Sequence, residues 1–301
     1  MASPLDPLRL LDSGNRGAIL RGIRADVSSF DPPENPDPEL IEVIDRPFES
    51  LPDTEARFSR LNERLRERAD RRSVFLSIYT RMTREVRVGI EEGTFEDPAW
   101  MQSYVLAFAD YYRRAFLSFE RGALDDVPGP WRVAFGTAIR GDTLIVQDAF
   151  LGINAHINYD LALSLDDVGI DPERTAKYRD HRAINDVLAD LVDDQQTLLA
   201  EVYAPGVEDI DAIFGRFDEA FTLLSMTEGR EQAWRVATVL AEFDWSLVRS
   251  YARWVLRMTA LGVAAMIRAP GLDPQVLDAL KDIEQEGIEH GQLLGRLAGN
   301  V

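Results

Sequence analysis

Residues 144–165 read LIVQDAFLGINAHINYDLALSL, and this stretch decides the fold class. Apolar residues recur in it every three or four positions, which is the spacing of one face of an α-helix. That face carries Val146, Phe150, Ile153, Ile157 and Leu161. The stretch therefore predicts one long apolar helix, which other elements of the fold must cover.

The helical period recurs on both sides of this stretch, and no segment shows the alternation of apolar and polar residues that indicates a strand. Dipeptides that contain proline, such as Asp97-Pro98 and Gly129-Pro130, separate the periodic runs. Helices are predicted over residues 53–69, 75 to 89 or 93, 98–115, 131–138, 144–165, 174–203, 209–221, 230–267 (one long or kinked helix) and 272–297. We therefore expect an all-α fold, with about eight helices in a single domain over residues 51–301.

Residues 1–50 have a different composition. They are rich in proline, aspartate and glycine, as in FDPPENPDPELIEVIDRP at positions 30–47. Proline fixes φ and removes an amide donor. This segment predicts an extended N-terminal arm, with at most a short helix near residues 15–26.

The charge and the cysteine content of the chain exclude several classes of protein. It has 52 acidic residues against 33 basic ones, a formal net charge of -19, and no cysteine. Disulfide scaffolds, thiolate zinc sites and cysteine nucleophiles are therefore excluded. A strongly acidic chain without a basic patch is also a poor binder of nucleic acid and of anionic membranes.

The types of charged residue indicate the salt concentration of the protein's environment. Aspartate supplies 30 of the 52 acids, and Lys177 and Lys281 are the only lysines. This pattern favours a cytoplasm with high salt, where the Debye length is about 3 Å and carboxylates keep a protein hydrated. The alternative is a genome whose codons favour arginine and aspartate.

No segment has the pattern of a targeting or membrane element. The N-terminal residues lack the basic region and apolar core of a signal peptide. The most apolar stretch, residues 254–267, is interrupted by Arg257 and is shorter than the ~20 residues of a membrane span. We therefore expect a cytoplasmic protein with no membrane span.

Four polar side chains flank the apolar face of the 144–165 helix. His156 and Asp160 lie four residues apart on one flank, and Asn154 and Asn158 lie four apart on the other. Burying such groups costs free energy unless they are paired or bound to a ligand. The segment therefore predicts a polar centre at the edge of the core.

Two more helices are predicted to direct polar groups at the core. His181 lies near the apolar face of the 174–203 helix, with Asn185 one turn later, and Asp244 lies on the apolar face of the 230–267 helix. A buried aspartate must be hydrogen-bonded, ion-paired, protonated or bound to metal. The structural alternatives are a satisfied core histidine and an Asp244 that pairs with an arginine.

The segments LGINAHINYDL (151–161) and KYRDHRAINDVL (177–188) resemble a family of uncharacterised all-helical proteins marked by an N-A-H-I-N-Y-D-L segment. The resemblance covers most of the chain after the N-terminal arm, and it carries no assigned activity. It implies that Asn154, His156, Asn158, Asp160 and the 181–186 stretch form a shared polar centre.

A weaker resemblance is to zinc-dependent phospholipase C and the P1-type nucleases, which are all-α and bind metal through His-x3-Asp and His-x3-Glu on helices. His156-x3-Asp160 matches the first pattern, whereas His181-x3-Asn185 departs from the second. Those enzymes hold three zinc ions, for which the three histidines of this chain are too few. A trinuclear site is therefore excluded, and a site for one or two ions stays open.

The leading hypothesis is an enzyme that acts on a small molecule through a polar centre in a helical bundle, by metal-assisted hydrolysis. The ligands of a divalent ion would be His156, Asp160, His181 and Asp244. The candidate bases toward a metal-bound water are Asp160, Asp180 and Asp186. The groups that orient the substrate would be Asn154, Asn158 and Asn185.

Two alternatives stay open. In a metal-free enzyme, His156 or His181 would be a general base, oriented by an aspartate, in an aromatic pocket for an apolar substrate. In a non-enzymatic ligand-binding or interaction protein, the polar centre would be a buried hydrogen-bond network. The sequence leaves the substrate and the oligomeric state open.

Overall fold

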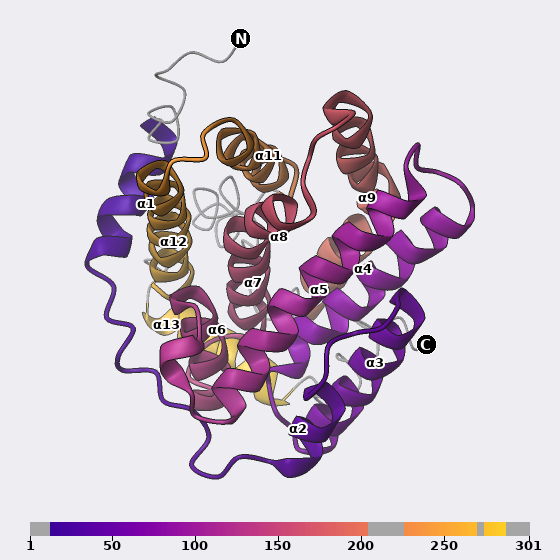
Figure 1. Ribbon diagram of the computed structural model, residues 1–301. Coiled ribbons are helices and arrows are strands. Elements are labelled where there is room, and N and C mark those ends of the chain that lie inside the picture. The colour runs from indigo at the N-terminus through magenta and orange to yellow at the C-terminus, as the bar shows by residue number, and fades with distance from the viewer. Residues whose placement is uncertain (1–12, 204–225, 270–273, 287–301) are drawn as a thin grey trace.

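The computed structural model describes residues 13–203, 226–269 and 274–286, and every regular element in these ranges is a helix (Figure 1). The all-α prediction is confirmed. The helices are α1 (Ser13–Ile23), α2 (Pro38–Ile44), α3 (Leu51–Glu67), α4 (Ser73–Glu91), α5 (Pro98–Glu120), α6 (Gly129–Arg140), α7 (Ile145–Ala155), α8 (Leu161–Val168), α9 (Arg174–Tyr203), α11 (Met226–Glu242), α12 (Ser246–Arg268) and α13 (Pro274–Glu286), with the short turns η2 (Leu124–Asp126) and η3 (His156–Asp160). With α7, η3 and α8 taken as one rod, the described ranges hold eleven helices, so the prediction of about eight was too low.

The stretch 144–165 forms the central rod of the fold, with α7, η3 and α8 in direct succession. Helices α4, α5, α6, α11 and α12 pack around it and come from both halves of the chain (Figure 1). On the predicted apolar face, Phe150, Ile153 and Ile157 are only half-buried, whereas Asn154 and His156 on other faces are buried. The rod is therefore covered on several sides, and its polar centre lies inside the bundle.

Polar caps and prolines set the helix boundaries near the site. The carboxylate of Asp97 accepts a hydrogen bond of 2.9 Å from the amide of Trp100, and Pro98 occupies the first turn of α5, where no amide donor is required. Gly141 ends α6 in the left-handed conformation, with φ at 62°. These boundaries fix the registers of α5 and α6 against the central rod.

The described part of the predicted N-terminal arm packs onto the bundle. The short helix expected near residues 15–26 is α1, whereas α2 was not expected. Helix α1 lies along α12 (Figure 1), and a Cβ atom at Gly262 would overlap the backbone of Ala18. The composition of residues 1–50 does not show that α1 packs against α12, because α12 lies far away in the sequence.

The one long or kinked helix predicted over residues 230–267 is two helices, α11 and α12, separated at residues 243–245. Asp244 lies in this break and is exposed, so its predicted inward position was wrong. Outside the helix the chain turns the carboxylate to solvent, which avoids the cost of burying a charge. The helix predicted over residues 209–221 and the end of the one over 272–297 lie outside the described residues.

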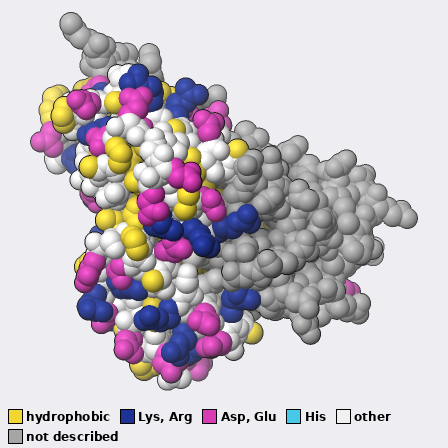
Figure 2. All heavy atoms as spheres, turned by 90° about the vertical axis from the view of Figure 1, so that its right-hand side faces the viewer, with side chains coloured by type: hydrophobic (Ala, Val, Ile, Leu, Met, Phe, Trp, Pro, Cys, Tyr) yellow, Lys and Arg dark blue, Asp and Glu magenta, His cyan; other side chains and the backbone are white. Residues whose placement is uncertain are grey.

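The face shown in Figure 2 mixes acidic and basic side chains over its described part. Many surface charges are paired, as where Arg87 on α4 bonds to both Glu55 and Glu91. Among the described helices, none has an apolar run that could cross a lipid bilayer.

Candidate functional site

His156 and Asp160 are hydrogen-bonded across η3, which is a π-helical turn. The Nδ1 atom of His156 lies 3.0 Å from Oδ2 of Asp160, and the same oxygen accepts a hydrogen bond of 2.7 Å from the indole N–H of Trp131. All three side chains are buried. Single π-helical turns within α-helices are frequent at functional sites. Here Oδ2 of Asp160 is hydrogen-bonded to Trp131 and to the imidazole of His156 at the same time.

Aromatic rings fix the imidazole of His156 on two sides. The ring of Phe108 stacks on it with centroids 3.5 Å apart and planes within 7°, and the ring of Tyr79 meets it edge-on at 4.3 Å. In the part of the chain that the structure describes, the buried Nε2 atom of His156 has no hydrogen-bond partner. Because Nδ1 is engaged with Asp160, Nε2 is the nitrogen left to act on a ligand.

Burial moves the pKa values of the pair in opposite directions. It lowers the pKa of His156 well below its usual value. It raises the pKa of Asp160 well above its usual value, and the hydrogen bond from Trp131 works against this rise. The charged form of each group loses its hydration in the core. His156 is therefore neutral at pH 7, and the tautomer that donates from Nδ1 to Asp160 has its lone pair on Nε2.

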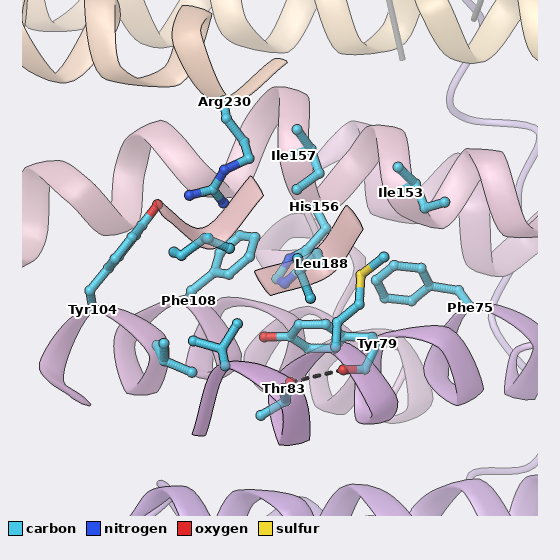
Figure 3. Close-up of a pocket in the computed structure, with 14 residues that line it drawn as sticks. Phe75, Tyr79, Thr83, Tyr104, Phe108, Ile153, His156, Ile157, Leu188 and Arg230 are labelled. Atoms are coloured by element: carbon cyan, nitrogen blue, oxygen red, sulfur yellow. Dashed lines mark hydrogen bonds between the residues drawn. The ribbon is translucent and has the colours of Figure 1, made fainter. Parts of the chain in front are cut away.

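An apolar cavity of about 60 Å³ lies beside this pair, between the central rod and helices α4, α5, α9 and α11 (Figure 3). Its volume exceeds the ~10–15 Å³ that a single water needs. Its walls are mainly aliphatic and aromatic, and the lining side chains with polar atoms are Tyr79, Thr83, Tyr104, His156 and Arg230. In Figure 3 the guanidinium of Arg230 lies beside the hydroxyl of Tyr104, Phe75 lies at the opposite side, and His156 lies between them.

The second inward histidine, His181 on α9, links three helices. Its Nε2 lies 3.0 Å from the carbonyl oxygen of Arg230, so Nε2 carries the proton and donates it. Its Nδ1 then accepts from the hydroxyl of Tyr104 at 3.0 Å and from the guanidinium of Arg230 at 3.3 Å. Burial and the charge of Arg230 lower the pKa of His181, which keeps the ring neutral. His181 does not line the cavity, but it positions two residues that do.

Arg230 on α11 is a buried cation, with only 3% of the residue exposed. Its Nη2 atom donates to the carbonyl oxygen of His181 at 2.5 Å. Within the described ranges its Nε atom has no partner, and no carboxylate pairs with its guanidinium. The neighbouring Glu231 bonds instead to the hydroxyl of Tyr178 at 2.8 Å and pairs with Arg182. Burial lowers the pKa of Arg230, yet arginine stays protonated in proteins.

The three asparagines predicted to orient a substrate do not line the cavity. Asn154 donates to the carbonyl oxygen of Ala260 at 2.8 Å and accepts from Asn158 at 3.0 Å, which ties the central rod to α12. Asn185 is half-buried, and its Oδ1 atom has no partner among the described residues. The structure thus gives Asn154 and Asn158 a packing role.

The four predicted metal ligands do not meet. Among the described residues, no three His, Asp or Glu side chains form a group that could hold a metal ion. His156 and Asp160 are a pair, both ring nitrogens of His181 are engaged, and Asp244 is exposed at the break after α11.

Two of the predicted bases lie away from the cavity. Asp186 is exposed on α9. Asp180 is buried, and its two oxygens accept hydrogen bonds from the amides of Glu96 and Asp97 at 2.7 and 2.8 Å. It therefore fixes the turn between α4 and α5.

Four residues of the site were not predicted from the sequence: Trp131, Arg230, Tyr104 and Phe108. Arg230 had a usable signal. It precedes Ala233 and Ala237 at helical spacing, and these alanines are buried in the same face of α11. An arginine on the apolar face of a helix is as unusual as the inward histidines that the sequence did single out.

Fold and site define an all-helical protein whose central rod carries a buried histidine–aspartate pair beside an apolar cavity. The chain belongs to the family of unknown function DUF5995, whose model matches residues 51–270. This range contains the histidine–aspartate pair and every described residue that lines the cavity, and the expected membership of an uncharacterised family is confirmed. Neither the search of curated proteins nor that of solved structures gave a match.

Proposed function

We propose that this protein is an enzyme in which neutral His156 acts as a general base on a small, largely apolar substrate. The observation that carries the proposal is the position of Nε2, which is buried beside the cavity and has no partner among the described residues. An imidazole held in one orientation with a free ring nitrogen can take a proton from a substrate or from a water next to it.

Asp160 and Trp131 have supporting roles in this proposal. When His156 takes up a proton, Oδ2 of Asp160 at 3.0 Å accepts a hydrogen bond from Nδ1 of the imidazolium that forms and so stabilises it. Trp131 keeps one carboxylate oxygen in place at 2.7 Å. The parallel ring of Phe108 prevents rotation of the imidazole, so Nε2 stays directed at the same point. A general base placed in this way contributes about 10²–10⁴-fold to a rate.

The metal-free mechanism is preferred over metal-assisted hydrolysis on geometry. The metal mechanism needs His181 and Asp244 beside His156, but the first is engaged on both ring nitrogens and the second is exposed. A non-enzymatic ligand-binding protein would use the same cavity without turnover, and the experiment below distinguishes it.

The experiment has two parts. First, ¹⁵N NMR of histidine-labelled protein should show Nε2 of His156 unprotonated and Nδ1 protonated at pH 7. Second, a panel of small apolar esters is assayed for hydrolysis, and a panel of small carbon acids is assayed for deuterium exchange in D2O. We expect turnover of at least one compound, and a loss of about 10²-fold or more in His156→Gln.

His290, which lies outside the described residues, supplies the matched control, and His290→Gln should keep full activity. Turnover that survives in a folded His156→Gln variant would contradict the proposal. Saturable binding without turnover of any compound would favour the ligand-binding protein instead.

A further inference from the structure

Arg230 places a positive charge at the apolar cavity, and we propose that the cavity binds a short-chain carboxylate there. The carboxylate pairs with the guanidinium of Arg230, and the aliphatic chain extends toward His156. This inference deepens the proposed function, since it names the substrate class of the same site. The binding itself rests on Arg230 and the cavity, not on catalysis by His156.

The buried charge of Arg230 lacks a compensating carboxylate among the described residues. A buried guanidinium needs compensation for its lost hydration, and a carboxylate is its usual partner because two parallel hydrogen bonds match the two planar groups. The partners that Arg230 finds in the described part of the chain are neutral, namely the carbonyl oxygen and Nδ1 of His181 and the hydroxyl of Tyr104. Its buried Nε–H has no acceptor there. A ligand carboxylate would supply both the charge and the missing acceptor.

The charge of the cavity lining sets the charge of the ligand that it can bind. Among the described residues that line the cavity, Arg230 is the only lysine, arginine, aspartate or glutamate, and His156 there is neutral. One fixed positive charge suits a monoanion. A phosphate dianion would keep an uncompensated charge among apolar walls, and an ammonium ligand would be repelled.

The walls and the volume of the cavity limit the rest of the ligand. Ile153, Ile157, Ile184 and Leu188 give the cavity aliphatic walls, and its volume of about 60 Å³ leaves room for a short chain only. Figure 3 shows the guanidinium of Arg230 to one side of the imidazole of His156. A chain that starts at Arg230 therefore runs past His156, which places its carbon atoms beside the general base.

The proposal is tested by NMR on protein labelled at the isoleucine δ1 methyl groups, since Ile153, Ile157 and Ile184 line the cavity. The wild type is titrated with straight-chain carboxylates from acetate to hexanoate. We expect saturable shifts of these three methyl signals, with the tightest binding at three to five carbons. Butanamide has the size of butanoate without its charge and should bind at least tenfold more weakly. Equal affinity for the amide, or no saturable shift with any member of the series, would overturn the proposal.

Variants separate this inference from the proposed function. Arg230→Met should lose butanoate binding, whereas Arg182→Met, which removes an exposed arginine one residue after His181, should keep it. His156→Gln should still bind butanoate. If it does, and the wild type turns over no compound, the role of His156 as a base is contradicted while the carboxylate site is supported. Turnover of neutral substrates without preference for acids would support the role of His156 as a base and contradict the carboxylate site. If Arg230→Met does not fold, the comparison of acid with amide on the wild type decides.

Discussion

Nε1 of Trp131 and Nδ1 of His156 both lie within hydrogen-bond distance of the same oxygen of Asp160, at 2.7 and 3.0 Å. Residues from α6 and from both ends of the π turn thus form one buried chain of hydrogen bonds. In that chain the indole is the fixed donor, because it can only donate. The protonation of Asp160 therefore depends on Trp131 as well as on burial.

We predict that Trp131→Phe raises the pKa of Asp160 further, because the variant removes the hydrogen bond that lowers it. The free energy of unfolding should fall by about 1–3 kcal/mol, the cost of a lost buried hydrogen bond to a charged group. The pKa is read from a ¹³C-carboxyl NMR titration. Trp100→Phe is the control, since Trp100 donates at 2.9 Å to a backbone carbonyl, that of Gly169. It should lower stability without moving the pKa of Asp160.

The second prediction concerns the dependence of stability on pH. The folded state lowers the pKa of His156 below 6.5, so the unfolded chain binds a proton more readily. Stability from this residue is present above pH 6.5 and is lost as pH falls, by up to about 1.4 kcal/mol per pH unit. The difference in unfolding free energy between wild type and His156→Asn should therefore shrink from pH 7.5 to pH 5 in urea titrations. Asp160 titrates in both proteins, so a pH-independent difference would show that His156 is not kept neutral.

The helices were predictable because their signals are local. The 3–4 spacing of apolar residues and the pair Asp97-Pro98 act within one turn of the chain, and the start of α5 lies where this pair places it. The break at residues 243–245 has no proline or glycine to mark it. One long or kinked helix was therefore predicted over this region, with Asp244 on its apolar face.

The site was only partly predictable, because its key contacts join distant residues. His156 and Asp160 stood out through their spacing of four residues, and they do form a pair. Trp131 reaches the pair from another helix, 29 residues away from Asp160 in the chain. The π turn adds a residue to the helical repeat, so projection at 100° per residue misplaces side chains after it. Nothing in the spacing of single residues reveals either feature.

Asp180, which the sequence offers as a catalytic base, provides the third prediction. Asp180→Asn replaces one of two carboxylate oxygens that accept backbone amides, so it should cost about 1–3 kcal/mol of stability. Turnover and butanoate binding by the folded variant should match the wild type. Asp186→Asn is the matched control on the same helix, and because Asp186 is exposed its effect should stay within ~0.5 kcal/mol. A folded Asp180→Asn variant with a greatly reduced kcat would show that Asp180 has a role in catalysis.

The last prediction tests whether the N-terminal helix is part of the fold. At Gly262 the backbones of α12 and α1 touch, and a Cβ atom there would overlap the carbonyl group of Ala18. Gly262→Ala must therefore push α1 away from α12, at a cost of about 1–3 kcal/mol or more, as for other overpacked sites. Backbone atoms cannot change rotamer to make room. Amide hydrogen exchange should show α1 losing protection while the central rod keeps its own.

Gly17→Ala is the control for this change within the same helix pair. Gly17 is exposed on α1, and a Cβ atom there would meet only the end of the Arg21 side chain at an ordinary contact distance of 3.6 Å. Alanine costs less backbone entropy than glycine in a helix, so this variant should gain about 0.5–1 kcal/mol. Equal stability of the two alanine variants in thermal unfolding would mean that α1 does not dock against α12 at Gly262. The N-terminal segment would then be the arm that its composition suggests.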